Sequence, residues 1–364
     1  MRFPEFSGEW NKYTINDLAT VVGGGTPDTT VKSYWGGDIQ WFTPSEIGKN
    51  KYVDFSKRTI TRDGLDNSSA KLLPLHTILL SSRATVGECS IASNECTTNQ
   101  GFQSLIAKQC NIDFLYYLIQ TKKKDLIRNA CGSTFLEISA NEIRKIKVAV
   151  PVQNEQEQIA KLLSLIDERI ATQNKIIEKL QSLIKGLVDE LMTVLLKGKL
   201  YPFSSFYIKA GEGGTPTTSV VEYYTEGTIP FIKIEDLSCK YLTNNKDFIT
   251  ELGMQKSSAW LIPSKSVIYS NGATIGAISI NEYPVCTKQG ILGIVPNTNI
   301  NVEYLYLLMS SSYFSKEISR IITEGTMKTA YLKDINHIKC PLPSMAQQKN
   351  ITNLTSSIEE KLSI

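Results

Sequence analysis

Apolar residues recur at alternating steps of three and four along residues 153–199, a stretch without proline. This spacing is the heptad pattern of a coiled coil, sustained here for about five repeats. At ~1.5 Å per residue it predicts a helix on the order of 60 Å long between Glu155 and Leu196. The residues that form this apolar seam are Ile159, Leu163, Ile166, Ile170, Ile177, Leu180, Ile184, Leu187 and Leu191.

The same alternating spacing of three and four residues recurs near the end of the sequence, where the apolar positions include Ile351 and Ile358. An isolated helix of about 18 residues is marginal in water, so this one needs a partner. We expect it to pack antiparallel on the apolar seam of the central helix. The alternative is an amphipathic tail that frays.

The segments outside these helices show shorter patterns of both kinds. Thr77–Ser82, Gly87–Ala92 and Ser266–Tyr269 are short and rich in β-branched or apolar residues, which is typical of strands. Asp113–Thr121 and Val302–Ser312 have helical spacing. We therefore expect a mixed α/β fold.

Two distant parts of the sequence have nearly the same residues in the same order. SSRATVGECSIA, from Ser81 to Ala92, returns as YSNGATIGAISI, from Tyr269 to Ile280. The turn GGTP and the loops NQG and KQG also match between the halves at an offset of 189 residues. Ile143, Ile146 and Pro151 match Ile335, Ile338 and Pro343 at an offset of 192. Matches in one order at a nearly fixed offset indicate an internal duplication.

The repeats divide the sequence into four predicted parts. These are an N-terminal domain (1–152), a helical spacer (153–199), a second domain (200–343) and a short distal helical region (344–364). The fold class we expect is two repeated α/β domains separated by one long helix.

Composition limits the class of protein without identifying it. The 364 residues are 41% hydrophobic and 21% charged, with a net charge of +3, as for an ordinary globular chain that does not demand a polyanionic partner. No apolar run reaches the ~18 residues that span a bilayer, and the N-terminus lacks a signal-peptide pattern. The seven cysteines form no CxxC pair, which indicates reduced thiols in a cytoplasmic protein.

Motifs for catalysis and for metal binding are missing from the sequence. It contains no phosphate-binding GxxxxGK[ST] loop, no GxGxxG fingerprint, no HExxH and only two histidines, neither placed as in a catalytic triad. We therefore predict no catalytic residue, no metal site and no cofactor bound by this chain.

The arrangement and its residues resemble the specificity subunit of type I restriction-modification systems. The resemblance covers essentially the whole chain: the paired GGTP turns, TILLSSRATVGE with TTNQGF, SVIYSNGATIGAISI with CTKQGI, and the closing runs IRKIKVAVPVQNEQEQIAKLL and INHIKCPLPSMAQQKNI. It implies two target recognition domains, each of which reads one half of a split double-stranded DNA site.

The resemblance also implies the partners. The helices would set the unread gap between the half-sites and dock two copies of an adenine-N6 methyltransferase subunit, and restriction subunits would join that complex. S-adenosylmethionine, Mg²⁺ and ATP would then belong to the partners, in agreement with the lack of catalytic motifs.

The positions that differ between the repeats are candidates for reading different bases. Arg83 suits guanine, because its guanidinium can bond O6 and N7 together, whereas Gly272 at the matching position cannot. Amide side chains suit adenine edges, and a lysine suits phosphate or guanine. An amide beside a glycine can instead tie down its own loop. The candidate DNA-binding residues are Arg83, Asn99, Gln100, Lys288, Gln289, Thr26 and Thr215.

Three other functions are compatible with the same features. The chain could serve a single-chain methyltransferase-nuclease of another restriction type, or it could be a coiled-coil scaffold that holds two protein-binding domains without DNA. It could also be an enzyme with an unfamiliar site. The genes beside this one, and DNA binding in the presence of the methyltransferase, test the first two of these alternatives.

Overall fold

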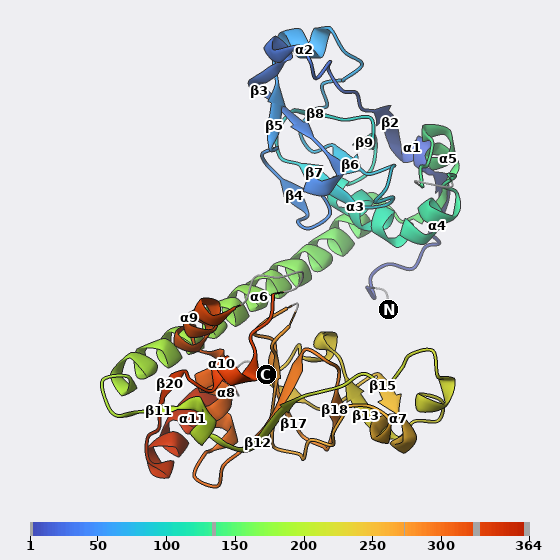
Figure 1. Cartoon of the computed structure of the whole chain (residues 1–364). Coiled ribbons are helices and arrows are strands. Elements are labelled where there is room, and N and C mark those ends of the chain that lie inside the picture. Colours follow the sequence, from blue (N-terminus) through green and yellow to red (C-terminus); the bar gives the residue numbers. More distant parts are fainter. Residues whose placement is uncertain (1–2, 133–135, 273, 323–327, 360–364) are drawn as a thin grey trace. The chain divides into compact units, whose positions relative to one another are not determined.

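The computed structural model describes residues 3–132, 136–272, 274–322 and 328–359. The chain divides into two compact units, Met1–Thr172 and Gln173–Ile364. The helix α6 (Gln153–Leu195) is 43 residues long and runs from the first unit into the second (Figure 1). The long helix predicted from the heptad pattern is thus confirmed as one continuous element.

The first unit is a mixed α/β fold. Its helices are α1 (Ile15–Leu18), α2 (Arg62–Asp66), α3 (Ile112–Thr121), α4 (Lys123–Arg128) and α5 (Ala140–Lys145). Its strands are β1 (Asn11–Thr14), β2 (Ala19–Gly23), β3 (Trp35–Phe42), β4 (Tyr52–Val53), β5 (Arg58–Ile60), β6 (Ile78–Leu80), β7 (Cys89–Ala92), β8 (Cys96–Thr98), β9 (Gln103–Ala107) and β10 (Lys147–Val150).

The second unit has matching elements, with a 3₁₀ turn (Phe203–Ser205) in place of α1 and with its last helix in place of the start of α6. Its strands are β11 (Leu200–Pro202), β12 (Tyr207–Glu212), β13 (Ile229–Ile232), β14 (Tyr241–Leu242), β15 (Asp247–Ile249), β16 (Val267–Ser270), β17 (Ile278–Asn281), β18 (Cys286–Thr287), β19 (Ile291–Pro296) and β20 (Lys339–Pro341). Its helices are α7 (Glu251–Gln255), α8 (Val302–Ser310), α9 (Ser312–Ile321), α10 (Leu332–Ile335) and α11 (Met345–Glu359).

The strand orders show that the duplication is structural as well as sequential. The first unit has a five-stranded sheet of order β2-β9-β6-β7-β4, a three-stranded sheet β5-β3-β8 and the pair β1-β10. The second unit has β12-β19-β16-β17-β14, β15-β13-β18 and β11-β20 in the same roles. The mixed α/β class and the internal repeat predicted from the sequence are both confirmed.

Side chains of the central strands are buried on both faces of each five-stranded sheet. Ile78 and Leu80 of β6 enter the core shared with helices α3 and α5, whereas Leu79 between them enters a second core with Phe42 and Phe102. Successive residues of a strand point to opposite faces, which explains why this segment reads as an unbroken apolar run. In the second unit, β16 divides its side chains between two cores in the same way.

Helix α11 closes the second unit in the way that the start of α6 closes the first. It packs on α8, with Ile351 buried in the second unit's main core, and Ile358 is half-buried. The sequence did not predict the contact with α8. Ile351 also shares this core with Val188 and Met192 of the central helix α6. Because α11 matches the first turns of α6, its apolar residues complete their own domain.

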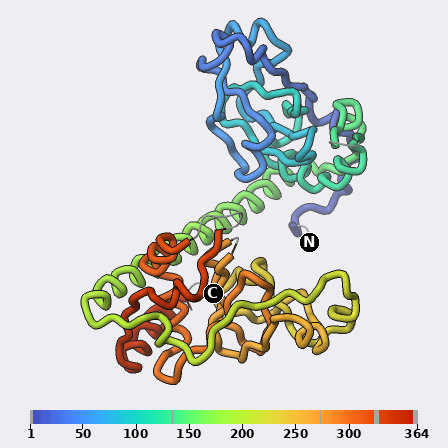
Figure 2. The backbone as a smooth tube through the Cα atoms, in the orientation of Figure 1, coloured from blue at the N-terminus to red at the C-terminus, as the bar shows by residue number. Residues whose placement is uncertain are grey.

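The apolar seam of α6 is buried only towards its ends. Ile159 packs on the first unit's main core, and Ile184 and Leu191 pack on that of the second, beside the buried Val188 and Met192. Near its C-terminal end α6 lies beside α9 (Figure 2), where Asp189 accepts hydrogen bonds from the backbone and hydroxyl of Ser312 at 2.9 and 2.6 Å. The remaining predicted seam residues are half-buried (Leu163, Leu180, Leu187) or exposed (Ile166, Ile170, Ile177).

A buried glutamine joins each closing helix to its domain. The amide of Gln156 donates to the Pro151 carbonyl at 3.0 Å and accepts from the Asn111 backbone at 3.0 Å. Gln348 makes the matching bonds to Pro343 and Asn301 at 2.9 and 2.8 Å. Each side chain thereby satisfies backbone groups at the start of a helix and in the loop before another.

We expect Gln156→Leu to destabilise the first unit by about 2–3 kcal/mol, because the change keeps the volume but leaves a buried backbone donor and acceptor without partners. Gln158→Ala, at an exposed position of the same helix, is the control. Urea unfolding of both variants measures the difference. Equal stability of the two variants would show that the buried bonds contribute nothing net.

Candidate nucleic-acid interface

Loops at one edge of the first unit bring together the predicted base-reading residues. Arg83, Asn99 and Gln100 line one open pocket, together with Pro44, Ala84 and Gly101. The Thr26 hydroxyl donates to the side-chain carbonyl of Gln100, which connects the GGTP turn to this pocket. The four candidates of the first domain therefore form a single site.

Close backbone packing explains the glycines of the GGTP turns. A Cβ atom on Gly24 would overlap the carbonyl oxygen of Asn99, and one on Gly213 would overlap that of Thr287. The backbone of Gly25 also donates to the Thr98 carbonyl at 2.8 Å. Glycine is required here because the turn lies directly against the loop that carries the amide side chains.

Arg83 is presented by a strained loop. The next residue, Ala84, has φ of 63°, which is rare for a residue with a side chain, and its backbone donates to the Leu136 carbonyl at 3.1 Å. The Arg83 Nε lies 3.8 Å from a Glu137 carboxylate oxygen, and both side chains are about half exposed. An exposed ion pair of this length is weak, so the guanidinium can exchange this partner for another.

Asn99 and Gln100 also stabilise their own loop. The Asn99 side-chain oxygen accepts from the Gly101 backbone at 2.9 Å, and Gln100 accepts from Thr26. The loop-tethering role that was the alternative for these amides is thus present in the free chain. It occupies only part of the hydrogen-bonding capacity of each side chain, because an amide has two donors and one acceptor oxygen.

The second unit has an equivalent pocket with different chemistry. Thr215, Lys288 and Gln289 line it together with Gly272, which stands where the first unit has Arg83. The Gln289 backbone donates to the Thr215 hydroxyl at 3.5 Å. The three candidates of the second domain are therefore also gathered in one place.

Sequence reasoning missed three charged residues of this second pocket, Glu212, Lys233 and Glu235. Lys233 and Glu235 line it, at the positions of Thr43 and Ser45 in the first unit. Lys233 forms an ion pair with Asp247 at 2.8 Å, and the hydrogen bond that the lysine donates to this carboxylate is the main cause of its raised pKa. An alignment of the repeats on their shared residues does not point to Lys233 and Glu235, because the charged side chains of this pocket stand at positions where the repeats differ.

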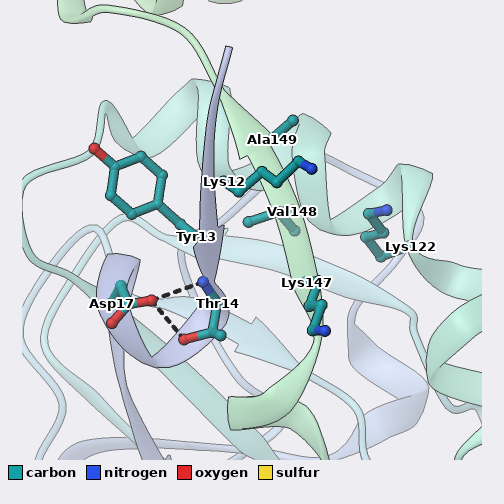
Figure 3. A pocket seen from close by; sticks show the side chains of 8 residues that line it. All are labelled: Lys12, Tyr13, Thr14, Asp17, Lys122, Lys147, Val148 and Ala149. Atoms are coloured by element: carbon teal, nitrogen blue, oxygen red, sulfur yellow. Dashed lines mark hydrogen bonds between the residues drawn. The ribbon is translucent and has the colours of Figure 1, made fainter.

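A third pocket lies elsewhere on the first unit, around the strand pair β1-β10 (Figure 3). Lys12, Lys122 and Lys147 line it, and its carboxylate, Asp17, accepts two bonds of 2.7 Å from Thr14. These bonds hold the pKa of Asp17 below its usual range. The pocket is basic, but it includes none of the predicted base-reading residues.

Most cysteines of the described residues are buried. No group of three or more histidine, cysteine or acidic side chains in this part of the chain could hold a metal ion. Burial raises the pKa of the Cys89, Cys96, Cys110 and Cys340 thiols to about 12, which makes them poor nucleophiles at neutral pH. None of the described helices has the length and apolarity needed to cross a lipid bilayer.

Comparison with known proteins identifies the family. The family model described as the type I restriction modification DNA specificity domain matches residues 7–182 and 206–364, one match for each repeat. The chain belongs to this family.

Relatives in the family are specificity subunits. Over 97% of its length the chain is 29% identical to the type I restriction enzyme MjaIX specificity subunit of Methanocaldococcus jannaschii, covering 88% of that protein. It is 28% identical to the EcoR124I/EcoR124II specificity subunit of Escherichia coli, over 46% of this chain and 43% of the relative.

Solved structures support the fold of this family member. The crystal structure of the type I restriction-modification S subunit from M. genitalium matches with a TM-score of 0.57 and 19% identity, over 100% of this chain and 93% of that one. A chain from a study of the assembly of a type I restriction-modification system matches with a TM-score of 0.61 and 14% identity, over 99% and 92%.

We expect Gly24→Ala to destabilise this family member by about 1–3 kcal/mol, because the added methyl group overlaps the backbone of the Asn99 loop. Gly186→Ala is the matched control: a Cβ there meets nothing within 4 Å, so the change should stabilise α6 by about 0.5–1 kcal/mol. Chemical denaturation of both variants tests this. If Gly24→Ala leaves the free energy of unfolding unchanged, the GGTP turn and the Asn99 loop can move apart at little cost.

Proposed function

We propose that this chain is the DNA-specificity subunit of a type I restriction-modification complex and that it reads a two-part site in double-stranded DNA. The single observation that carries the proposal is the pair of equivalent pockets, one in each repeat, lined by different base-reading side chains. The names of its relatives, all specificity subunits of type I systems, support it.

The first pocket suits a half-site that contains guanine and adenine. Arg83 presents a forked donor for guanine O6 and N7, and Asn99 and Gln100 supply amides of the kind that bond adenine N6 and N7. The described residues that line the second pocket include no arginine. Lys288 is a donor for guanine or phosphate, Gln289 suits adenine, and the Glu235 carboxylate can accept a bond from the amino group of cytosine. The two half-sites should therefore differ.

The long helix has a separate role in this proposal. Because α6 continues from one unit into the other, its length would set the number of unread base pairs between the half-sites. Its exposed apolar residues, among them Ile166 and Ile170, offer a surface for two adenine-N6 methyltransferase subunits, which restriction subunits would join. Those partners would hold S-adenosylmethionine, Mg²⁺ and ATP, and the chain itself would have no enzymatic activity. The complex would work in the cytoplasm.

The proposal is tested by reconstitution with the methyltransferase subunit of the same restriction-modification system. Genomic DNA treated with both proteins should carry methylated adenine in one two-part motif with a fixed gap. DNA treated with either protein alone should not. The purified chain alone should transfer no methyl group. Methylation of the same motif without this chain, or transfer by this chain alone, would contradict the proposal.

Arg83→Ala should relax the preference for a single base in one half-site, at a cost of roughly 1–3 kcal/mol in discrimination, and leave the other half-site unchanged. Binding of the reconstituted complex to duplexes with each base varied in turn measures this. Arg62→Ala, which removes another exposed arginine of the first unit, is the control. A uniform loss over all sequences, with a shallower salt dependence, would assign Arg83 to a phosphate instead.

A further inference from the structure

A partly buried lysine joins three elements of the first unit. The side chain of Lys51 is only 13% exposed, and its ammonium lies 2.8 Å from the Asp113 carboxylate of α3 and 2.6 Å from the Ser164 hydroxyl of α6. Its backbone carbonyl accepts from Ile91 of β7 at 2.7 Å. Lys51 therefore connects the edge of the five-stranded sheet to α3 and to the start of α6.

The second unit repeats this arrangement at the matching position. The side chain of Lys240 is also 13% exposed and contacts the carboxylates of Glu303 on α8 and Glu359 on α11 at 2.7 and 2.6 Å. The backbone carbonyl of Lys240 accepts from Ile280 of β17 at 2.7 Å. In both units a tyrosine next to the lysine, Tyr52 or Tyr241, donates to the first of these carboxylates at 2.6 Å.

The two copies reach the closing helix by different side chains. In the first unit the Tyr117 hydroxyl lies 3.3 Å from the Lys51 ammonium and donates to Asp167 of α6 at 2.6 Å. In the second unit Leu307 stands in place of Tyr117, and the longer Glu359, in place of Asp167, reaches the lysine directly. The residues differ, but the connection between lysine and helix is present in both.

Hydrogen bonds between opposite charges keep the lysine and the carboxylates of each cluster ionised. Burial opposes the charged forms, yet bonds from Lys51 and Tyr52 keep the pKa of Asp113 below its usual range, and bonds to Glu303 and Glu359 raise the pKa of Lys240. Removing one partner leaves the other charge half-buried and unpaired, which costs more than the pair contributes. Such a cluster resists small rotations of the helix because several short bonds would break together.

Small rotations of α6 matter because the helix is long. From Asp167 to Leu195 it extends for roughly 40 Å, so a tilt of about 5° at Asp167 moves the far end by roughly 3.5 Å, close to the ~3.4 Å between successive base pairs. The contacts at the start of α6 are therefore in a position to change which gap between half-sites is accepted.

We propose that Lys51, acting through Tyr117 and Asp167, is a positioning residue that fixes the direction of α6 against the first recognition sheet and so determines the accepted gap. This inference rests on the proposed function. Lys240 forms the same kind of cluster on α11, a helix that lies wholly within the second unit, and so has no such effect on the gap.

The test measures gap preference separately from base preference. The reconstituted complex of the full chain with its methyltransferase is bound to duplexes in which the two half-sites are kept and the gap is shortened or lengthened by one or two base pairs. The variants are Lys51→Met and the milder Tyr117→Phe, which keeps the ring but removes the hydroxyl. The matched controls are Lys240→Met and Tyr116→Phe, since the Tyr116 hydroxyl bonds to Gln120 of its own helix.

Lys51→Met should reduce the discrimination between the preferred gap and its neighbours about tenfold, as expected for the loss of a charged hydrogen bond. Tyr117→Phe should act in the same direction with unchanged base preferences, and it decides the outcome if Lys51→Met does not fold. Unchanged gap discrimination in folded Tyr117→Phe, or equal loss in the controls, would overturn the inference. A wild-type complex that selects no two-part motif would overturn the proposed function itself.

Discussion

The fold of each unit depends on satisfying the backbone groups where a closing helix meets its domain. Gln156 and Gln348 carry out this task from inside the protein, each bonded to a proline carbonyl and to the backbone of an asparagine that caps another helix. Buried backbone groups without partners are costly, so this joint restricts where the helix can begin. The sheet, the capped helix and the closing helix are held as one body, and the reading loops inherit their positions from it.

Much of this architecture follows from the sequence alone. The heptad spacing predicted α6, and the repeated phrases predicted two repeated domains, because a fixed offset over many anchors requires a common fold. The matching strand orders of the two units agree with this prediction. The role of the C-terminal helix was harder to predict. Ile351 and Ile358 carry the same spacing as the central seam, and periodicity shows that a helix has an apolar face without showing which partner covers it.

The candidate site was predicted in outline. Arg83 stood out because Gly272 replaces it in the second repeat, and Asn99 and Gln100 because they precede the shared Gly101. The structure gathers all three in one pocket. Lys233 and Glu235 were not found, since they replace a threonine and a serine that carry no signal of their own. The lysine clusters were also missed, because their members are far apart in sequence and only folding brings Lys51 next to Ser164.

The separation of the cores has an evolutionary consequence. The main core of the first unit draws on residues from Ile15 to Ala160, and that of the second on residues from Val188 to Ile351. Substitutions in the core of one repeat therefore change mainly the stability of that repeat. Under the proposed function, recombination within the gene can exchange one recognition domain, and with it one half-site, while the other domain and its half-site are retained.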